Sequence, residues 1–316
     1  MFKYIGKRLL ATIPTLFVVS IVIFLIIYMI PGGPASAMLG MEATPEQVAE
    51  LNDSLGFNRP FLEQYVSWIG GVFVGDWGDS FFLNMPVLQA LFEYFWPTFS
   101  LAIFAEIIAL ILSLPLGILA AYKQGTKIDY ITIGISLIGI AIPGFLLSIF
   151  LMIMLAVNVH LFPVAGYADI SKGILEHLRY LFLPALSLGI VQAAYLTRIT
   201  RTAFVEILNN NYIRTARAKG LTDFKILVTY GLKNAAPTIL TAIGQSFGAL
   251  ITGTIVTETI FNIPGLGMLT LSAINKRDLF VVQGVVLFVT LLYIIVNLIV
   301  DILYGVVDPR VQPDKD

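Results

Sequence analysis

Charged residues are scarce in this sequence. Only 12% of its 316 residues are Asp, Glu, Lys or Arg, whereas 58% are hydrophobic, and the mean hydropathy is +0.88. A soluble domain carries about 25% charged residues, roughly twice this share. The composition therefore excludes a soluble domain and predicts an all-α polytopic membrane protein.

Cysteine is absent and histidine occurs only twice. The lack of cysteine excludes disulfides, thiol chemistry and cysteine-based metal sites. His160 and His177 flank one predicted external loop, where they are either a metal pair or ordinary interfacial polar residues. We favour the second interpretation because nothing fixes their separation. No metal site is predicted.

Signatures of nucleotide binding and catalysis are also missing. The sequence contains no GxxxxGK[ST] phosphate loop, no HExxH, no GxSxG and no Rossmann fingerprint. The predicted spans hold no paired nucleophile and base, which argues against a membrane-embedded enzyme. The chain itself is therefore expected to bind no cofactor and no nucleic acid and to have no catalytic residue.

Long charge-free runs make up most of the chain. A helix needs roughly 20 residues to cross about 30 Å of hydrocarbon. Six runs qualify, near Leu9 to Ile30, Trp96 to Tyr122, Tyr130 to Val159, Tyr180 to Thr197, Ala235 to Thr257 and Leu279 to Val300. The third is over-long and contains Pro143-Gly144, which favours one kinked or tilted helix over two spans. The first is too long for a signal peptide and is expected to stay as an anchor.

Lysine and arginine are distributed unevenly between the two sides of these spans. If both termini are cytoplasmic, fourteen of these residues lie inside and five outside, the five being Arg59, Lys172, Arg179, Lys276 and Arg277. The positive-inside rule favours that orientation. We therefore expect an N-terminal helix at 1–30, an extracytoplasmic segment at 31–95, a transmembrane core at 96–308 and a cytoplasmic tail at 309–316.

The external segment 31–95 is predicted to begin with a break and a capped helix. Pro31 to Pro34 reads Pro-Gly-Gly-Pro and ends the first span. Thr44 to Gln47 forms a capping box with proline at the first helical position. This helix is expected to stop at Gly56.

A second external helix is predicted from near Pro60 to Gly70-Gly71, followed by the turn-rich stretch Gly75 to Ser80. A solvated linker is the alternative for the whole segment. The capped amphipathic helices, with Trp68 and Trp77, favour a small folded cap lying on the outer membrane face.

Polar residues within the spans are candidates for a translocation path. A charge in hydrocarbon costs about 3 kcal/mol unless it faces protein or water. Glu106 lies midway along the second span and is either a path residue or a structural glutamate. Glu258 lines the outer end of a path or caps a loop. Gln192 and Gln245 line a cavity or join helices.

The stretch from Tyr212 to Lys233 is basic and amphipathic and does not resemble a span. Its first half interleaves small residues with Arg214, Arg217 and Lys219. Its second half is expected to place Phe224, Leu227, Val228 and Leu232 on one helical face. The pattern predicts two short cytoplasmic helices hinged at Gly220, with Thr222 and Asp223 at the start of the second.

Seven motifs follow one another in a specific order. They are SWIGGVFVGDWGDS (67–80), LPLGILAAYKQGTKIDY (114–130), LFPVAGY (161–167), LPALSLGI (183–190), YIRTARAKGL (212–221), ETIFNIPGLGMLTLSAINKRD (258–278) and VNLIVDILYGVVDPR (296–310). In their order and spacing the chain resembles permeases of the dipeptide/oligopeptide/nickel family of binding-protein-dependent ABC importers. The resemblance covers nearly the whole chain and implies a type I ABC importer permease fold.

The resemblance also implies that Tyr212 to Lys233 is the EAA loop, which docks into an ATPase subunit. Arg214-Thr215-Ala216 stands where the family has Glu-Ala-Ala, Gly220 is its glycine, and Lys233 replaces its terminal proline. This variant resembles the peptide-transporting branch. The implied coupling residues are Arg214, Thr215, Ala216, Arg217, Lys219, Gly220 and Leu221. A passive basic segment held against anionic lipid is the alternative.

The implied function is that of a transmembrane permease subunit of an importer for oligopeptides or dipeptides, working by alternating access. Implied partners are a sister permease, two ATPase subunits that hold ATP and Mg²⁺, and an extracytoplasmic peptide-binding protein, in a bacterial or archaeal cell membrane. A nickel-chelate or glutathione permease of the same family is one alternative. A secondary transporter is another, although inverted repeats and several embedded charges are not evident.

Overall fold

The computed structural model describes residues 2–40 and 43–307, so the expected tail 309–316 lies outside the described residues. Regular structure in the described part is helical, apart from one isolated bridge between Asp79 and Pro86. Five helices there are long and apolar enough to cross a membrane, and a bent pair brings the number to six. The five are α1 (Phe2–Tyr28), α5 (Val87–Tyr122), α8 (Ile174–Leu208), α11 (Lys233–Gly253), which continues the preceding segment from Asp223, and α14 (Leu279–Val307). The predicted all-α membrane fold is confirmed.

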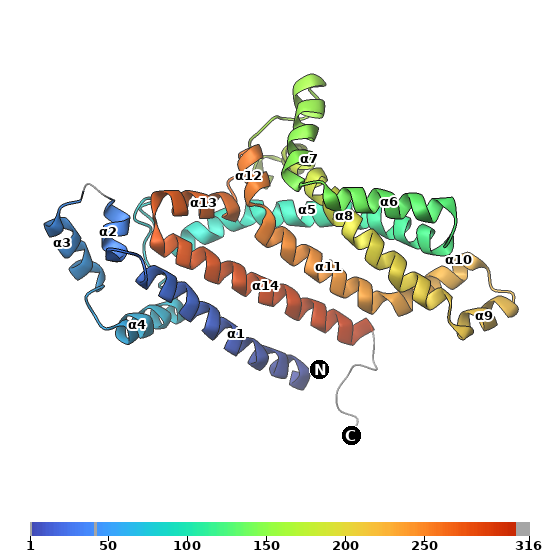
Figure 1. The fold of residues 1–316 in the computed structure, drawn as a ribbon, viewed down its shortest axis with the longest axis horizontal. Helices are drawn as coiled ribbons and strands as arrows, with labels where there is room; N and C mark the ends of the chain where they lie inside the picture. Colours follow the sequence, from blue (N-terminus) through green and yellow to red (C-terminus); the bar gives the residue numbers. More distant parts are fainter. Residues whose placement is uncertain (1, 41–42, 308–316) are drawn as a thin grey trace.

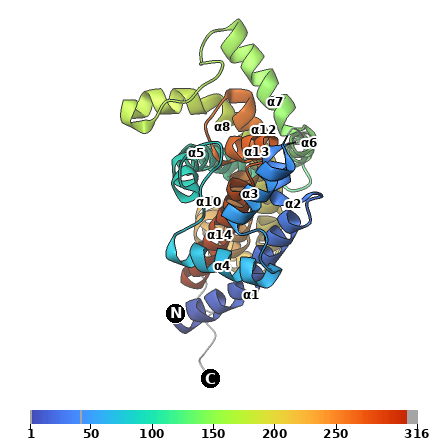
Figure 2. The same ribbon diagram turned by 90° about the vertical axis from the view of Figure 1, so that its left-hand side faces the viewer.

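The bent pair occupies the third predicted run. It consists of α6 (Lys127–Ala141) and α7 (Gly144–Leu151), which continues into the π-helical segment η1 (Met152–Asn158). The two parts meet at 95°. Ile142 leaves the helical region, with φ −75° and ψ 122°, because the proline that follows disfavours the α conformation. The departure from a straight helix lies at Pro143-Gly144 as predicted, but it is a break with a 95° bend and not a kink in one continuous helix. Figure 2 shows α7 projecting away from the bundle.

Two helices are longer than the charge-free runs predicted. Helix α5 begins at Val87 where Trp96 was expected, and α8 runs from Ile174 to Leu208 where Tyr180 to Thr197 was expected. Charged residues end a hydrophobic run but do not end a helix, because Glu, Lys and Arg are good helix formers. These helices therefore extend past the hydrocarbon at their ends.

Helices α5 and α8 approach each other closely at two glycines. A Cβ at Gly117 would lie 2.7 Å from the Thr200 Cβ, and one at Gly189 would lie 2.9 Å from the Ala105 carbonyl oxygen. Small residues allow membrane helices to pack backbone against backbone. This pair forms the centre on which α11 and α14 are assembled.

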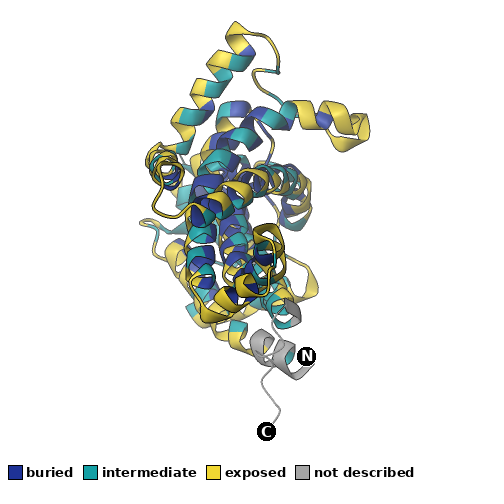
Figure 3. Ribbon diagram, turned by 90° about the vertical axis from the view of Figure 1, so that its right-hand side faces the viewer, coloured by how far each residue is buried: buried dark blue, intermediate teal, exposed yellow. Residues whose placement is uncertain are grey.

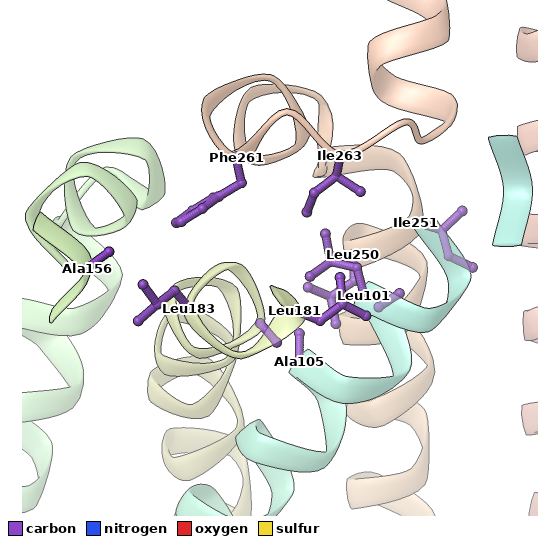
Figure 4. Packing of buried hydrophobic residues seen from close by; sticks show 11 residues of the cluster. Leu101, Ala105, Ala156, Leu181, Leu183, Leu250, Ile251, Phe261 and Ile263 are labelled. Atoms are coloured by element: carbon purple, nitrogen blue, oxygen red, sulfur yellow. The ribbon is translucent and has the colours of Figure 1, made fainter. Parts of the chain in front are cut away.

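The largest buried cluster joins these central helices to the loop that follows α12 (Ile255–Phe261) (Figure 4). Its labelled members are Leu101 and Ala105 on α5, Leu181 and Leu183 on α8, Leu250 and Ile251 on α11, Ala156 on η1, and Phe261 and Ile263. In Figure 3 the buried residues lie where helices face one another and the exposed ones on the outward faces.

The segment after α1 folds into helices α2 (Gly33–Leu39), α3 (Pro45–Leu55) and α4 (Phe61–Val74), here called the cap. The predicted capping box is present, since Gln47 N donates to Thr44 Oγ1 at 3.3 Å and Thr44 N donates to Gln47 Oε1 at 2.9 Å. Gly56 ends α3 with φ +71°. The prediction that the second cap helix ends at Gly70-Gly71 is wrong, because the helix continues to Val74 and turns at Gly75.

Aromatic packing and a hydrogen bond beyond α4 both hold the cap to the bundle. Phe24 on α1 packs edge-on against Phe61 and Tyr65, with ring centroids 5.4 and 5.6 Å apart. Beyond α4, Ser80 Oγ donates a 2.6 Å hydrogen bond to Asp278 Oδ2, and Asp278 precedes α14. The turn-rich motif thus anchors the cap to the start of the last span.

The remaining short elements lie at the two ends of the bundle. They are η2 (Ile170–Lys172), α9 (Asn211–Ala218), α10 (Asp223–Lys225), the π-helical η3 (Ile226–Leu232) and α13 (Leu266–Lys276). Figure 1 shows the cap at one end of the long helices and α9 and α10 at the other. Anything that links the two ends must act through the spans.

Candidate functional site

A polar contact joins three spans in the interior of the bundle. Ser246 Oγ on α11 donates to Glu106 Oε2 on α5 at 2.7 Å, and Gln192 Nε2 on α8 donates to the Ser246 carbonyl oxygen at 3.0 Å. Glu106 is 5% exposed, and among the described residues its Oε1 has no hydrogen-bond partner. A buried carboxylate oxygen without a partner is costly unless water or a ligand reaches it.

Gln245 lies on a different face of α11 from its neighbour Ser246. It is exposed, and Tyr195 Oη donates to Gln245 Oε1 at 2.9 Å. These two side chains line an open groove of about 340 Å³ between α8, α11 and α14, which Tyr304 also lines. The structure therefore brings Glu106 and Gln192 together and places Gln245 outside that contact.

Helix α11 carries further exposed polar residues in line with Gln245. They are Thr238, Thr241 and Thr252, which lie seven, four and seven residues from Gln245 and therefore share one face with it. An uncharged polar face on a membrane helix fits water or another polypeptide better than lipid. Sequence reasoning identified only Gln245, although the helical spacing of the threonines would have revealed this face.

Glu258 is fully buried, far along the chain from the Glu106 contact. Its carboxylate accepts hydrogen bonds from Thr98 Oγ1 at 2.6 Å, Thr254 Oγ1 at 2.7 Å and Met268 N at 3.0 Å. A Cβ at Gly267 would lie 2.8 Å from Glu258 Oε2, so the glycines of this loop make room for the side chain. The geometry matches the loop-capping alternative, and a position on the path remains a prediction.

The basic segment begins with α9, which has one buried and one exposed face. Ile213 and Ala216 are buried against Phe204 and Ile226. Arg214, Thr215, Arg217 and Lys219 are exposed, Gly220 is exposed, and Leu221 is half-buried. The predicted coupling residues therefore form a cationic outer surface, except for Ala216, which fixes α9 to the bundle.

Gly220 adopts φ +81°, a conformation that glycine reaches without strain, and a Cβ there would meet nothing within 4 Å. The chain turns here from α9 to α10. The side chain of Thr222 accepts from Lys225 N at 3.4 Å, as expected of an N-cap.

The second half of the segment differs from the prediction of a separate short helix. Helix α10 continues through η3 into α11 as part of one long span. Phe224, Val228 and Leu232 are exposed, Leu227 is partly buried, and Ile226 and Gly231 are buried, so most of the predicted apolar face points away from the bundle core.

Asp223 joins the basic segment to the end of α5. Tyr122 Oη donates to Asp223 Oδ2 at 2.8 Å, and Arg217 Nε lies 3.5 Å from Asp223 Oδ1. Both ionic partners are about half-exposed, so the ion pair itself contributes little stability. The contacts of Asp223 matter because they fix the position of the basic segment against α5. The sequence analysis did not identify Tyr122 as a partner.

A second ion pair, which the sequence analysis did not predict, joins α6 to α8 near the same end of the bundle. Arg201 on α8 donates from Nε to Asp129 Oδ1 at 2.5 Å and from Nη2 to Asp129 Oδ2 at 2.8 Å. Gly125 N donates to the same carboxylate at 2.9 Å. Asp129 is 1% exposed, so the first turn of α6 is tied to α8 by a buried bidentate contact.

The two histidines have unrelated surroundings. His177 is buried, with Nδ1 2.7 Å from the Ala168 carbonyl oxygen and its ring edge-on to Tyr167. His160 is exposed. Within the described part of the chain, no group of three or more His, Asp or Glu side chains is placed to hold a metal.

Comparison with known proteins gives two matching family descriptions. "Binding-protein-dependent transport system inner membrane component" matches residues 113–313, and the N-terminal region of such membrane components matches residues 1–102. The first match covers well over half of the chain.

Curated relatives match from end to end. A probable peptide ABC transporter permease of Sinorhizobium fredii is 38% identical over 98% of this chain and 99% of its own length. A putative peptide transport system permease of Brucella abortus is 40% identical over 98% of both. The dipeptide transport system permease DppB of Escherichia coli is 37% identical over the whole of both chains.

Among solved structures, a chain of the inward-facing MetNI methionine ABC transporter matches with a TM-score of 0.57 and 18% identity. The match covers 70% of the present chain and 97% of the MetNI chain. At this identity the match concerns the fold alone.

Proposed function

Because the chain belongs to the family of binding-protein-dependent transport system inner membrane components, we propose that it is the permease subunit of an importer for dipeptides or oligopeptides. The observation that carries the peptide assignment is identity of 37% to 40% with peptide and dipeptide permeases, with at least 98% of each chain covered.

The exposed face of α9 is proposed as the coupling surface that docks into a partner ATPase subunit. The exposed or half-buried residues assigned to it are Arg214, Thr215, Arg217, Lys219, Gly220 and Leu221, and Ala216 belongs to the coupling segment through its buried side. Support comes from their exposure on one side of α9 and from Ile213 and Ala216, which fix the other side to the bundle. Asp223 connects this surface to α5, so movement at the ATPase reaches a span directly.

The translocation path is proposed to run beside α11, where the Glu106, Gln192 and Ser246 contact lies within the bundle and the Gln245 face lies outside it. The contact and the Gln245 face are both polar, and both lie on membrane-spanning helices, where polar side chains are rare and commonly mark a substrate pathway. Alternating access would expose this polar route first to one side of the membrane and then to the other.

The remaining partners follow from the family. We assign a sister permease against the exposed spans, two ATPase subunits that hold ATP and Mg²⁺, and an extracytoplasmic binding protein. Both termini and α9 are then cytoplasmic, and the segment 31–95, which contains the cap, is extracytoplasmic, before a transmembrane core at 96–308. The arrangement is supported by the position of the cap and of α9 at opposite ends of the bundle.

The test is transport by the complete importer reconstituted in liposomes with its partner subunits. Radiolabelled dipeptides, oligopeptides, a nickel chelate and glutathione are offered in turn with ATP inside. We expect ATP-dependent uptake of peptides. Uptake of the nickel chelate or glutathione alone would replace peptides as the substrate class, and ion-driven uptake without ATP would overturn the importer assignment.

A further inference from the structure

A pocket of about 360 Å³ lies between the cap and the neighbouring ends of α1 and α14. Its walls come from Phe24 and Tyr28 on α1, Phe57 and Trp68 in the cap, and Phe280 and Gln283 on α14. No part of α5, α8 or α11 lines it. The pocket is therefore separate from the polar route beside α11.

Gln283 provides the polar feature of this pocket. Its residue is 4% exposed, and no other described residue makes a hydrogen bond with its side-chain amide. The amide atoms of Gln283 are not among the fully buried side-chain atoms that lack a partner, so the amide is open to the pocket. An amide that is open to a cavity and bonded to no described residue is suited to a ligand with a complementary donor and acceptor, which is the pattern that a peptide bond presents.

The aromatic walls suit an apolar side chain. The Phe24 and Trp68 rings have centroids 5.6 Å apart, and the Phe57 and Phe280 rings are stacked at 6.4 Å. These rings come from three different segments, so the pocket exists only when the cap rests on the bundle. Rigid aromatic surfaces in a concave site are typical of pockets that bind aromatic or large aliphatic groups.

Charges of both signs lie at the exposed rim. Asp53 and Asp76 supply carboxylates, and Arg59 supplies a guanidinium. Arg59 is only loosely engaged with Glu63, at 3.5 Å and with both side chains 58% exposed. A small ligand with one ammonium and one carboxylate group can therefore meet an opposite charge at each end.

We propose that this pocket binds a short zwitterionic peptide with an aromatic or large aliphatic side chain, as a receiving site before the translocation path. The peptide bond pairs with the Gln283 amide, the side chain lies among the aromatic rings, and the termini face the rim charges. The peptide class rests on the proposed function, but the pocket and its chemistry do not.

The probe is alanyl-phenylalanine, titrated onto the complete importer in nanodiscs without the binding protein. A Trp77→Phe/Trp96→Phe background leaves Trp68 as the only tryptophan of this chain, and the difference from the same background with Trp68→Phe isolates its emission from that of the partner subunits. We expect a saturable change in Trp68 emission. Gln283→Leu is expected to weaken it about tenfold, the net worth of one or two hydrogen bonds.

Gln89→Leu is the matched control, because Gln89 is exposed and bonded to Glu93 away from the pocket. It is expected to bind like the parent. Gln283→Glu, which keeps the side-chain size, guards against misfolding and is also expected to bind more weakly. A peptide with blocked, uncharged termini is expected to bind several-fold more weakly than alanyl-phenylalanine.

Equal binding by the parent and both Gln283 variants would overturn the inference, as would the absence of saturable binding. A tightly bound lipid found in the pocket by native mass spectrometry would also overturn it, as would a Gln283 effect seen only on affinity for the binding protein. Uptake of peptides with an empty pocket leaves the proposed function standing and removes the inference. Peptide binding in the pocket without peptide uptake leaves the inference standing and removes the proposed function.

Discussion

The Arg201 guanidinium donates two hydrogen bonds to the Asp129 carboxylate, and this pair joins the bent pair of helices α6 and α7 to α8. Asp129 lies in the first turn of α6, and α8 leads within a few residues to α9. The pair therefore lies on a short physical route between the proposed coupling surface and the helix that bends at Pro143. Its rigidity makes α6 and α8 move together at this end.

Breaking this pair on one side should destabilise the fold. Asp129→Ala leaves a largely buried guanidinium without its partner, and we expect a loss of about 3 kcal/mol in the free energy of unfolding. Denaturant unfolding in detergent measures it. Arg59→Ala, which removes an exposed ion pair, is the control and should cost less than about 1 kcal/mol. Equal effects of the two variants would contradict the assignment.

Gly220 is expected to be needed for coupling and not for insertion. Gly220→Trp forces a bulky side chain onto a residue at φ +81° on the exposed side of the α9–α10 turn. We expect normal amounts of protein in the membrane but loss of co-purified ATPase subunits or of peptide-stimulated ATP hydrolysis. The result that would refute a coupling role is normal peptide uptake.

Gly173 supplies a matched control for that experiment. It also has a positive φ, +120°, and a Cβ there would also meet nothing within 4 Å, but it precedes α8 at the other end of the span. Gly173→Trp introduces the same strain and bulk away from α9. We expect it to leave ATPase association intact.

Glu106 is expected to affect transport through its open carboxylate oxygen. Glu106→Ala removes the contact to Ser246 and the unpartnered oxygen together, so uptake rate or peptide range should change. Ser246→Ala removes the contact alone. If both variants transport a series of peptides at the parent rate, Glu106 is a structural residue only.

Glu258 distinguishes a structural role from a path role by a different readout. Glu258→Ala leaves the donors Thr98 Oγ1, Thr254 Oγ1 and Met268 N without their acceptor. We expect the free energy of unfolding to fall by about 2 to 4 kcal/mol. Uptake should fall only as far as the amount of folded protein falls. Reduced uptake by a Glu258→Gln variant of unchanged stability would instead place Glu258 on the path.

Local features of the structure could be predicted from the sequence because the forces that set them act over a few residues. The capping box at Thr44, the turn at Gly220 and the break at Pro143 each depend on backbone preferences or on contacts between near neighbours. The spans follow from the hydrocarbon thickness alone. Helix ends such as Val87 and Leu208 were misplaced because hydrophobicity reports the membrane boundary and not the helix boundary.

The polar contacts of the candidate site depended on the tertiary structure. Arg201 and Asp129 are 72 positions apart, Tyr122 and Asp223 are 101 apart, and Ser246 and Glu106 are 140 apart. The sequence shows that burying such polar residues in a membrane costs free energy, but it does not identify their partners. The rotation of each helix about its axis decides which polar faces meet, and that rotation is fixed by close packing at positions such as Gly117 and Gly189. The sequence by itself therefore determined a polytopic membrane fold with a basic loop between two spans, and only packing between distant helices decided which of its polar groups act together.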